Sequence, residues 1–142
     1  MDKFIISGKK KIKGSIKVHG SKNAALPIIV ASLLSNKNLT LTNVPEVDDI
    51  NNMLTLLKGY GTKLKTHKDS IILNSNNLKN ISADYDIVRK MRASVLILGP
   101  LLSRFGYSKI SLPGGCAIGS RPIDIHLKAL AKLGVKFKII QG

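Results

Sequence analysis

Apolar residues recur along the chain with two spacings, one typical of helices and the other of strands. At 50–57 and again at 123–130 they stand at i, i+4 and i+7, which predicts the buried face of an amphipathic helix. A glycine follows each segment, Gly61 and Gly134, and suits the C-terminal cap of a helix. Short segments that alternate apolar and polar residues predict strands, at 15–20, 62–66, 70–75 and 135–139.

The same order of predicted elements occurs twice, which indicates an internal repeat. Residues 22–45 align with 90–113 at a displacement of 68, and each copy predicts an apolar helix, a loop, a strand and a closing proline. Each apolar helix contains a proline, Pro27 or Pro100, which is expected to bend or shorten it. After the closing proline the displacement grows to 73, so the second copy has five extra residues before its second helix.

The five extra residues fall in the glycine-rich segment 112–126, LPGGCAIGSRPIDIH, which holds the only cysteine of the chain. Cys116 stands a few residues before the expected helix and close to Arg121. A positive helix end and a guanidinium both favour the thiolate form of a cysteine. An inert buried cysteine is the alternative. The position of Cys116 in a loop inserted into a repeat favours a reactive thiol, with thiolate or proton-transfer chemistry.

Basic residues stand at the predicted start of the first helix of each copy. In the first copy Ser21 suits the N-cap, which leaves Lys22 and Asn23 in the first turn. A lysine there opposes the helix dipole, and its position is explained if an anion lies beside it. A solvated lysine in a lysine-rich chain is the equal alternative. The second copy also places basic residues at this point, at Arg89, Lys90 and Arg92.

The net charge of +15 favours an anionic partner, such as nucleic acid, an acidic membrane surface or a phosphorylated metabolite. Lysine supplies 19 of the 23 basic residues, and the chain is also rich in isoleucine and asparagine. All three residue types are expected when a coding sequence drifts toward A and T, so many of the lysines reflect composition more than function. The four arginines are better clues, because arginine binds anions through two parallel hydrogen bonds. Aromatic residues make up only 4% of the chain, which argues against base stacking and therefore against a nucleic-acid partner.

Composition narrows the class of protein further. A chain of 142 residues with 44% apolar residues suits one globular domain with a core. The longest apolar run has 11 residues, too short to cross a bilayer, and the N-terminus shows no secretory signal, so no membrane association is predicted. A single cysteine cannot form an internal disulfide, which favours a cytoplasmic location. No cysteine and histidine cluster has metal-ligand spacing, and no protein-bound metal is predicted.

Three segments resemble the signature segments of UDP-N-acetylglucosamine 1-carboxyvinyltransferases, a family of enolpyruvyl transferases. They are SKNAALP at 21–27, MRASVLILGPLL at 91–102 and SLPGGCAIGSRPIDIH at 111–126. They occur in the order of the family, and the resemblance runs from the first residue to the last. The related shikimate-pathway enolpyruvyl transferase shares the repeat architecture but lacks the Gly-Gly-Cys loop, and it is the weaker match.

The resemblance implies an α+β fold of repeated βαβαββ units, an inside-out α/β barrel also called an alpha-beta prism. Residues 1–21 would form N-terminal strands, which in the family pack on the second domain. Residues 22–142 would form two repeat units of the first domain, about 22–75 and 84–142. Family members are much longer, so the resemblance covers only their N-terminal part and the fold is expected to be incomplete here.

The implied reaction moves the enolpyruvyl group of phosphoenolpyruvate to the 3′-hydroxyl of UDP-N-acetylglucosamine, releases phosphate and needs no cofactor. It begins peptidoglycan synthesis, on which the cell wall, cell shape and cell division depend. Cys116 is implied as the proton donor and as the residue alkylated by fosfomycin. The motif match also implies a set of substrate-binding residues: Lys22, Asn23, Arg92, Arg121, Pro122, Ile123, Asp124 and Ile125.

The chain by itself is expected to be inactive or impaired, because an active-site cleft cannot close when one wall is missing. A separate chain that carries the missing C-terminal part is therefore an expected partner. The alternative is a non-catalytic remnant, or a fragment that binds the UDP-sugar. Apolar surface left uncovered by the missing units would favour association.

Overall fold

The computed structural model describes residues 3–9, 11–68, 70–79, 85–88, 91–111 and 123–140. The elements, in chain order, are α1 (Lys22–Ala31), the 3₁₀ helix η1 (Ser32–Leu34), β1 (Asn38–Thr42), α2 (Asp48–Gly59), β2 (Lys63–His67), β3 (Ser70–Asn74), α3 (Tyr85–Val88), the 3₁₀ helix η2 (Arg92–Ile97), α4 (Leu98–Phe105) and α5 (Asp124–Lys132).

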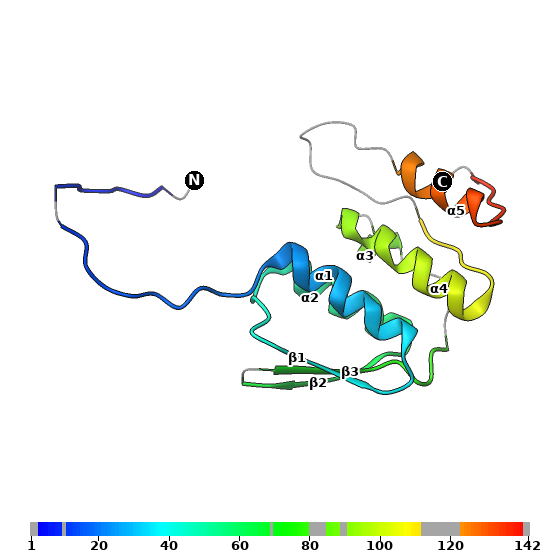
Figure 1. Ribbon diagram of the computed structural model, residues 1–142, viewed down its shortest axis with the longest axis horizontal. Helices are drawn as coiled ribbons and strands as arrows, with labels where there is room; N and C mark the ends of the chain where they lie inside the picture. The colour runs from blue at the N-terminus through cyan, green and yellow to red at the C-terminus, as the bar shows by residue number, and fades with distance from the viewer. Residues whose placement is uncertain are drawn as a thin grey trace.

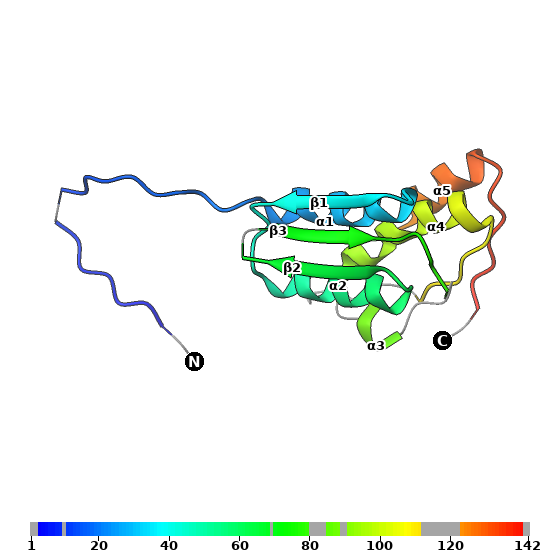
Figure 2. The ribbon, with the colours of Figure 1, turned by 90° about the horizontal axis from the view of Figure 1, so that it is seen from below.

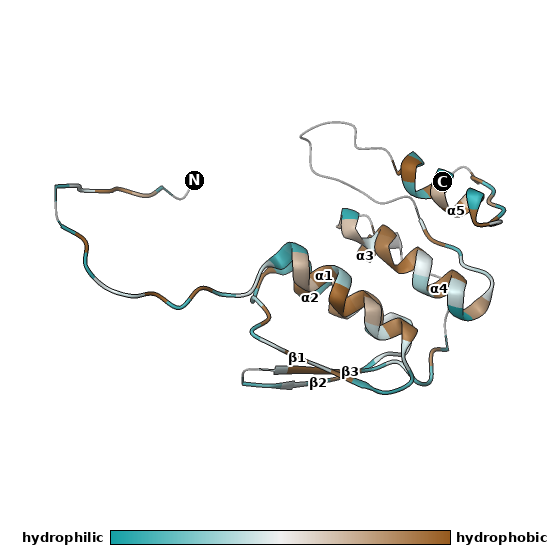
Figure 3. Ribbon diagram, in the orientation of Figure 1, coloured by the Kyte–Doolittle hydropathy of each residue, from teal (hydrophilic) through white to brown (hydrophobic). Residues whose placement is uncertain are grey.

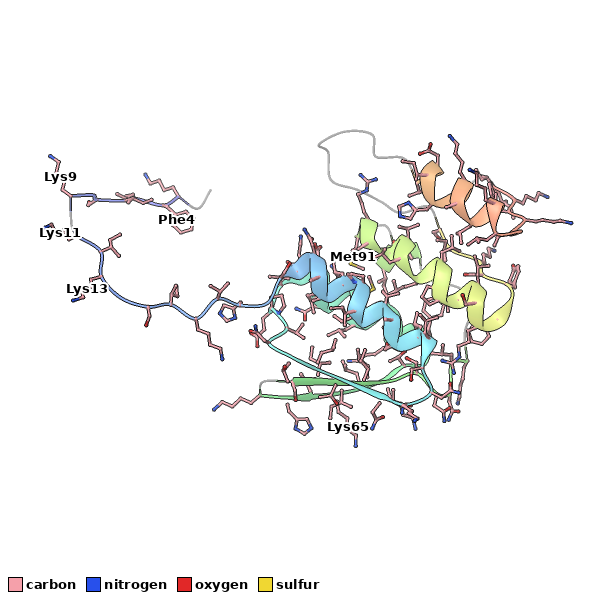
Figure 4. All side chains as sticks on the ribbon, viewed as in Figure 1. Phe4, Lys9, Lys11, Lys13, Lys65 and Met91 are labelled. Atoms are coloured by element: carbon pink, nitrogen blue, oxygen red, sulfur yellow. The ribbon has the colours of Figure 1, made fainter. Side chains whose placement is uncertain are left out.

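The three strands form one sheet in the order β1-β3-β2, and the central β3 is antiparallel to both neighbours. Leu73 of β3 pairs with Leu39 on one side and with Leu64 on the other, so a row of leucines crosses the sheet. This row faces α1 and α2, which cover the same face of the sheet (Figures 1 and 2). Lys65 points away from the helices on the opposite face (Figure 4). The period-2 pattern of the sequence therefore separates the core side from the solvent side.

The helices form further layers above the sheet. α1 packs along α2, while η2 and α4 pack against α1 and η1 on the side away from the strands (Figure 1). Because α1 has neighbours on both sides, it is apolar over most of its length (Figure 3). The most deeply buried core residues come from all of these layers: Ile29, Leu33, Ile50, Met53, Leu56, Leu57, Leu73, Val88, Ile97 and Leu101.

Both glycines predicted as C-caps end their helices with the left-handed backbone that this role requires. Gly61 follows α2 with φ +96°, and Gly134 follows α5 with φ +92°. The same two hydrogen bonds close each helix, at positions that differ by 73. They are Gly61 N to Lys58 O at 2.9 Å, Thr62 N to Leu57 O at 3.0 Å, Gly134 N to Ala131 O at 2.9 Å and Val135 N to Leu130 O at 3.1 Å. The two helices that the repeat predicts as equivalent therefore end with the same backbone geometry.

The two prolines occupy different positions in their helices. Pro27 lies inside α1, a helix of ten residues that continues as the 3₁₀ helix η1. Pro100 is the third residue of α4, where the missing N–H has no intrahelical partner to lose. The six residues before α4 form η2 instead of α-helix, so the apolar helix expected in the second copy is divided in two.

Three predicted strands are absent from the described residues. Segments 15–20 and 135–139 have no regular secondary structure. The third is the strand expected shortly before Pro113, where the described residues show only an isolated bridge at Lys109. A strand needs a neighbour for its backbone N–H and C=O groups, and the alternating pattern does not supply one. Residues 3–9 and 11–19 form an extended arm that leaves the body of the molecule, with Phe4 98% exposed (Figures 1 and 4).

Arg104 at the end of α4 links the second copy to the first. Its Nη1 donates to Leu33 O at 2.9 Å, and its Nη2 donates to Asn36 Oδ1 at 2.7 Å and to Asn76 O at 3.0 Å. Positions 36 and 104 are equivalent in the repeat, because they differ by 68. The two copies therefore meet at equivalent positions, and one guanidinium binds three acceptors there.

We expect Arg104→Lys to lower the free energy of unfolding by about 1–3 kcal/mol, because an ammonium cannot serve all three acceptors in this geometry. Equilibrium unfolding in urea measures the change. Asn36→Ala removes one acceptor and serves as a graded control with a smaller expected loss. A Lys variant as stable as the parent would show that the link between the copies does not depend on Arg104.

Candidate functional site

The first turn of α1 begins as the sequence predicts. Ser21 is the N-cap, with extended backbone, and its Oγ accepts a hydrogen bond from Ala24 N at 3.4 Å. Lys22 and Asn23 are the first two residues of the helix. The N–H groups and the positive end of the helix dipole therefore lie beside the side chains predicted to bind an anion.

Lys22 forms an ion pair with Asp49, the second residue of α2, at 2.6 Å between Nζ and Oδ2. The two helices run in the same direction on the sheet, so their first turns lie at the same end of the molecule (Figures 1 and 2). The sequence predicted that an anion beside Lys22 would explain its position, and in the structure this anion is a carboxylate of the protein itself.

Asp49 is the residue of this site that sequence reasoning missed. The signal available was weak, because two acidic residues at the start of an amphipathic helix are common for reasons of the helix dipole alone. Lys22 and Asp49 are 27 positions apart, and only the packing of α1 on α2 brings them together.

Gly20 fixes the approach of the chain to α1. A Cβ at this position would lie 2.0 Å from Asn43 O, in the loop between β1 and α2. Asn43 itself has a φ of +54°, so this loop is tightly bent where Gly20 meets it. The start of α1 is therefore held directly against the segment that leads to Asp49.

A surface cavity of about 230 Å³ lies next to this junction. Its walls come from the start of α1 and from the end of β1 with the loop that follows: Gly20, Ser21, Ala24, Ala25, Ile28, Leu41, Thr42, Asn43 and Val44. These side chains are mostly apolar and carry no charge. The wall of the cavity is therefore uncharged, and neither Lys22 nor Asp49 is part of it.

Arg92 begins η2, the element that packs against α1. Its side chain is half-buried, and Met91 just before it is 3% exposed and lies beside α1 (Figure 4). The structure thus brings the element that carries Arg92 to the helix that carries Lys22.

Ile123, Asp124 and Ile125 lie at the start of α5, where Ile123 is the N-cap and Asp124 occupies the first turn. Asp124 Oδ2 pairs with Lys128 Nζ at 3.5 Å, four residues further along the helix. Ile125 is 73% exposed, and none of the residues of α5 is buried. In Figure 1 α4 lies between α5 and α1.

Cys116, Arg121 and Pro122 lie outside the described residues, and their roles remain predictions from the motif. Among the residues that the structure describes, no group of three or more histidine, cysteine, aspartate or glutamate side chains could hold a metal ion.

Other buried polar groups belong to the core. The hydroxyls of Ser32, Thr62 and Ser75 lie together, with Thr62 Oγ1 2.9 Å and Ser32 Oγ 3.5 Å from Ser75 Oγ. Burial raises the pKa of Tyr60, which keeps its hydroxyl neutral. These side chains pack between the helices and the sheet and are closed to a ligand.

We expect Gly20→Ala to lower the free energy of unfolding by more than about 2 kcal/mol, because the new methyl group would collide with a backbone carbonyl. Gly14→Ala is the matched control, since a Cβ at Gly14 meets nothing within 4 Å, and it is expected to change stability by less than about 0.5 kcal/mol. Thermal unfolding followed by circular dichroism measures both. Equal melting temperatures for the two variants would contradict the close approach at Gly20.

Comparison with known proteins identifies relatives over the whole chain. The family model for EPSP synthase (3-phosphoshikimate 1-carboxyvinyltransferase) matches residues 6–142. The chain is 54% identical over 142 residues to a UDP-N-acetylglucosamine 1-carboxyvinyltransferase of Pelagibacter ubique and covers 34% of it. It is 52% identical over 137 residues to the enzyme of the same name from Campylobacter jejuni, and covers 33% of that protein. The chain therefore spans about a third of the length of these relatives.

Among solved structures the fold is similar to that of the enolpyruvyl transferase NikO from Streptomyces tendae. The TM-score is 0.79 at 15% sequence identity, over 94% of this chain and 29% of NikO. The enolpyruvyl transferase fold expected from the sequence is thus confirmed, in the incomplete form that was expected. Within the described residues no helix is both long and apolar enough to cross a membrane.

Proposed function

The chain belongs to the EPSP synthase family, and on that premise we propose that it serves the transfer of enolpyruvyl from phosphoenolpyruvate to the 3′-hydroxyl of UDP-N-acetylglucosamine. The observation that carries this proposal is the 54% identity, over all 142 residues, to an enzyme named for that reaction. The start of α1 supports it, because Lys22 and Asn23 stand where a helix dipole and an ammonium both attract an anion.

Both substrates suit the charge of the site. Phosphoenolpyruvate carries a phosphate and a carboxylate, and UDP-N-acetylglucosamine carries a diphosphate. In this proposal Lys22 and Asn23 bind phosphoenolpyruvate and the amino sugar, and Arg92 binds substrate anions. The residues at 121–125 line the site of the UDP-sugar, with Arg121 close to the phosphate.

Cys116 is assigned the proton transfer in this proposal. The 3′-hydroxyl of the sugar gives up its proton to a base in the proposed partner segment as its oxygen adds to the carbon of phosphoenolpyruvate that bears the phosphate. The neighbouring methylene must gain a proton. A thiol on a loop that closes over the substrates can donate this proton and exclude water from the oxocarbenium-like intermediate. Loss of phosphate and of a proton from the new methyl group then restores the enol ether.

The wider role follows from the same reaction. The product begins the synthesis of peptidoglycan, and the proposed location is the cytoplasm, where a lone thiol stays reduced. The 142 residues span about a third of the length of the relatives, and in this proposal the reaction also needs the part that corresponds to the other two thirds. We therefore propose a partner segment equivalent to the remaining two thirds of the relatives.

The test joins these 142 residues to the remaining two thirds of the Pelagibacter relative and measures phosphate release from phosphoenolpyruvate. We expect turnover with UDP-N-acetylglucosamine, none with shikimate 3-phosphate, and none with the 142 residues alone. Lys22→Gln is expected to lower kcat/KM about tenfold or more, since it removes a charged hydrogen-bond donor from the anion.

Lys37→Gln is the matched control, because Lys37 is an exposed lysine beyond the other end of α1. It is expected to leave kcat/KM unchanged. Turnover with shikimate 3-phosphate but not with UDP-N-acetylglucosamine would assign the chain to the other reaction of the family. Equal effects of Lys22→Gln and Lys37→Gln on kcat/KM would show that Lys22 does not bind the substrate.

A second prediction concerns the thiol. We expect fosfomycin to alkylate the joined protein once, at Cys116, as detected by intact-mass and peptide mass spectrometry. Cys116→Ser is the control, because it removes the only cysteine of the 142 residues and should abolish their labelling. Absence of labelling in a joined protein that turns over its substrates would contradict the role proposed for Cys116.

A further inference from the structure

We propose that Asp49 is a positioning residue for enolpyruvyl transfer, one that holds the ammonium group of Lys22 in place for phosphoenolpyruvate. This inference rests on the proposed function, in which Lys22 binds that substrate. Asp49 itself touches no substrate in the proposal and acts only through Lys22.

The geometry of the pair leaves Lys22 able to bind. Its Nζ lies 2.6 Å from Asp49 Oδ2 and donates to no other described residue. An ammonium has three N–H donors, so two of them remain for an anion. The Lys22 side chain is 46% exposed, which keeps these two donors open to solvent.

The pair contributes little to the stability of the fold, because solvent screens two partly exposed charges. It does resolve a local conflict of charge. Lys22 in the first turn of α1 opposes the dipole of its own helix, whereas Asp49 in the first turn of α2 is favoured by the dipole of its helix. The ion pair with Asp49 therefore offsets the unfavourable position of Lys22 at the start of α1.

The two backbones that carry the pair are fixed by the core. Next to Asp49 stands Ile50, 2% exposed, and next to the first turn of α1 stands Leu26, 5% exposed. A lysine side chain has four rotatable bonds and would otherwise lose much conformational freedom when substrate binds. Held by Asp49, its ammonium is ordered before the substrate arrives, and less entropy is lost on binding.

Asp49 could instead compete with phosphoenolpyruvate for Lys22, and this role predicts the opposite change in KM. If its carboxylate competed with the substrate anion for Lys22, neutralising it would tighten the binding of phosphoenolpyruvate. The sign of the change in KM therefore separates positioning from competition.

The experiment uses the joined protein described above and compares Asp49→Asn with Asp48→Asn. Asp48 is the neighbouring first residue of α2, is exposed, and makes no ion pair or side-chain hydrogen bond among the described residues. The two variants therefore change net charge and helix dipole alike and differ in the contact with Lys22. Asp49→Glu, which keeps the carboxylate, tests for rescue.

We expect Asp49→Asn to raise the KM for phosphoenolpyruvate about tenfold while the KM for UDP-N-acetylglucosamine stays unchanged. Asp48→Asn is expected to change neither by more than about twofold, and Asp49→Glu to recover most of the loss. A purely structural role would lower the amount of active protein, and so kcat, without this selective change in one KM.

Several results would overturn the inference. Equal kinetics of the two Asn variants, a lower KM for phosphoenolpyruvate in Asp49→Asn, or loss of its cooperative melting transition would each do so. In all three cases the parent protein still turns over, and the proposed function stands. No turnover by the parent would instead overturn the proposed function, and this inference with it.

Discussion

The packing of α1 along α2 on one face of the sheet is the interaction on which the rest of the molecule depends. Ile29 of α1 and Met53 of α2 are fully buried in this layer, and Leu73 closes it from the sheet. Burial of each such side chain stabilises the fold by about 1.5–3 kcal/mol. The same packing makes the two helices begin at one end of the molecule, and it thereby creates the pair of Lys22 and Asp49.

Local features of the fold could be predicted because the residues that cause them are close in sequence. The C-caps at Gly61 and Gly134 need only a positive φ after an amphipathic run, and both form with the same hydrogen bonds. The strands β2 and β3 follow from alternation and a tight connection. The strands expected at 15–20 and 135–139 fail because a pattern specifies which face is apolar but not which strand pairs with it.

The candidate site also has one part that could be predicted from the sequence and one part that could not. Ser21 as N-cap and Lys22 in the first turn could be recognised from a short motif, since capping depends on neighbouring residues. Asp49 could not, because its role depends on a contact between two helices separated by a strand and two loops. A sequence can indicate that a charge needs a partner, but tertiary packing decides whether the partner is a ligand or another side chain.

The two ends of α1 have different surroundings. Its C-terminal end leads into η1 and the following loop, where Arg104 of α4 binds Leu33 O and Asn36 Oδ1. Its N-terminal end lies about 15 Å away, ten residues of 1.5 Å each. There the free N–H groups and the Lys22–Asp49 pair remain partly exposed. Because the Arg104 contacts and the Lys22–Asp49 pair lie at opposite ends of the segment formed by α1 and η1, a change of charge at the pair is expected to leave the Arg104 contacts unchanged.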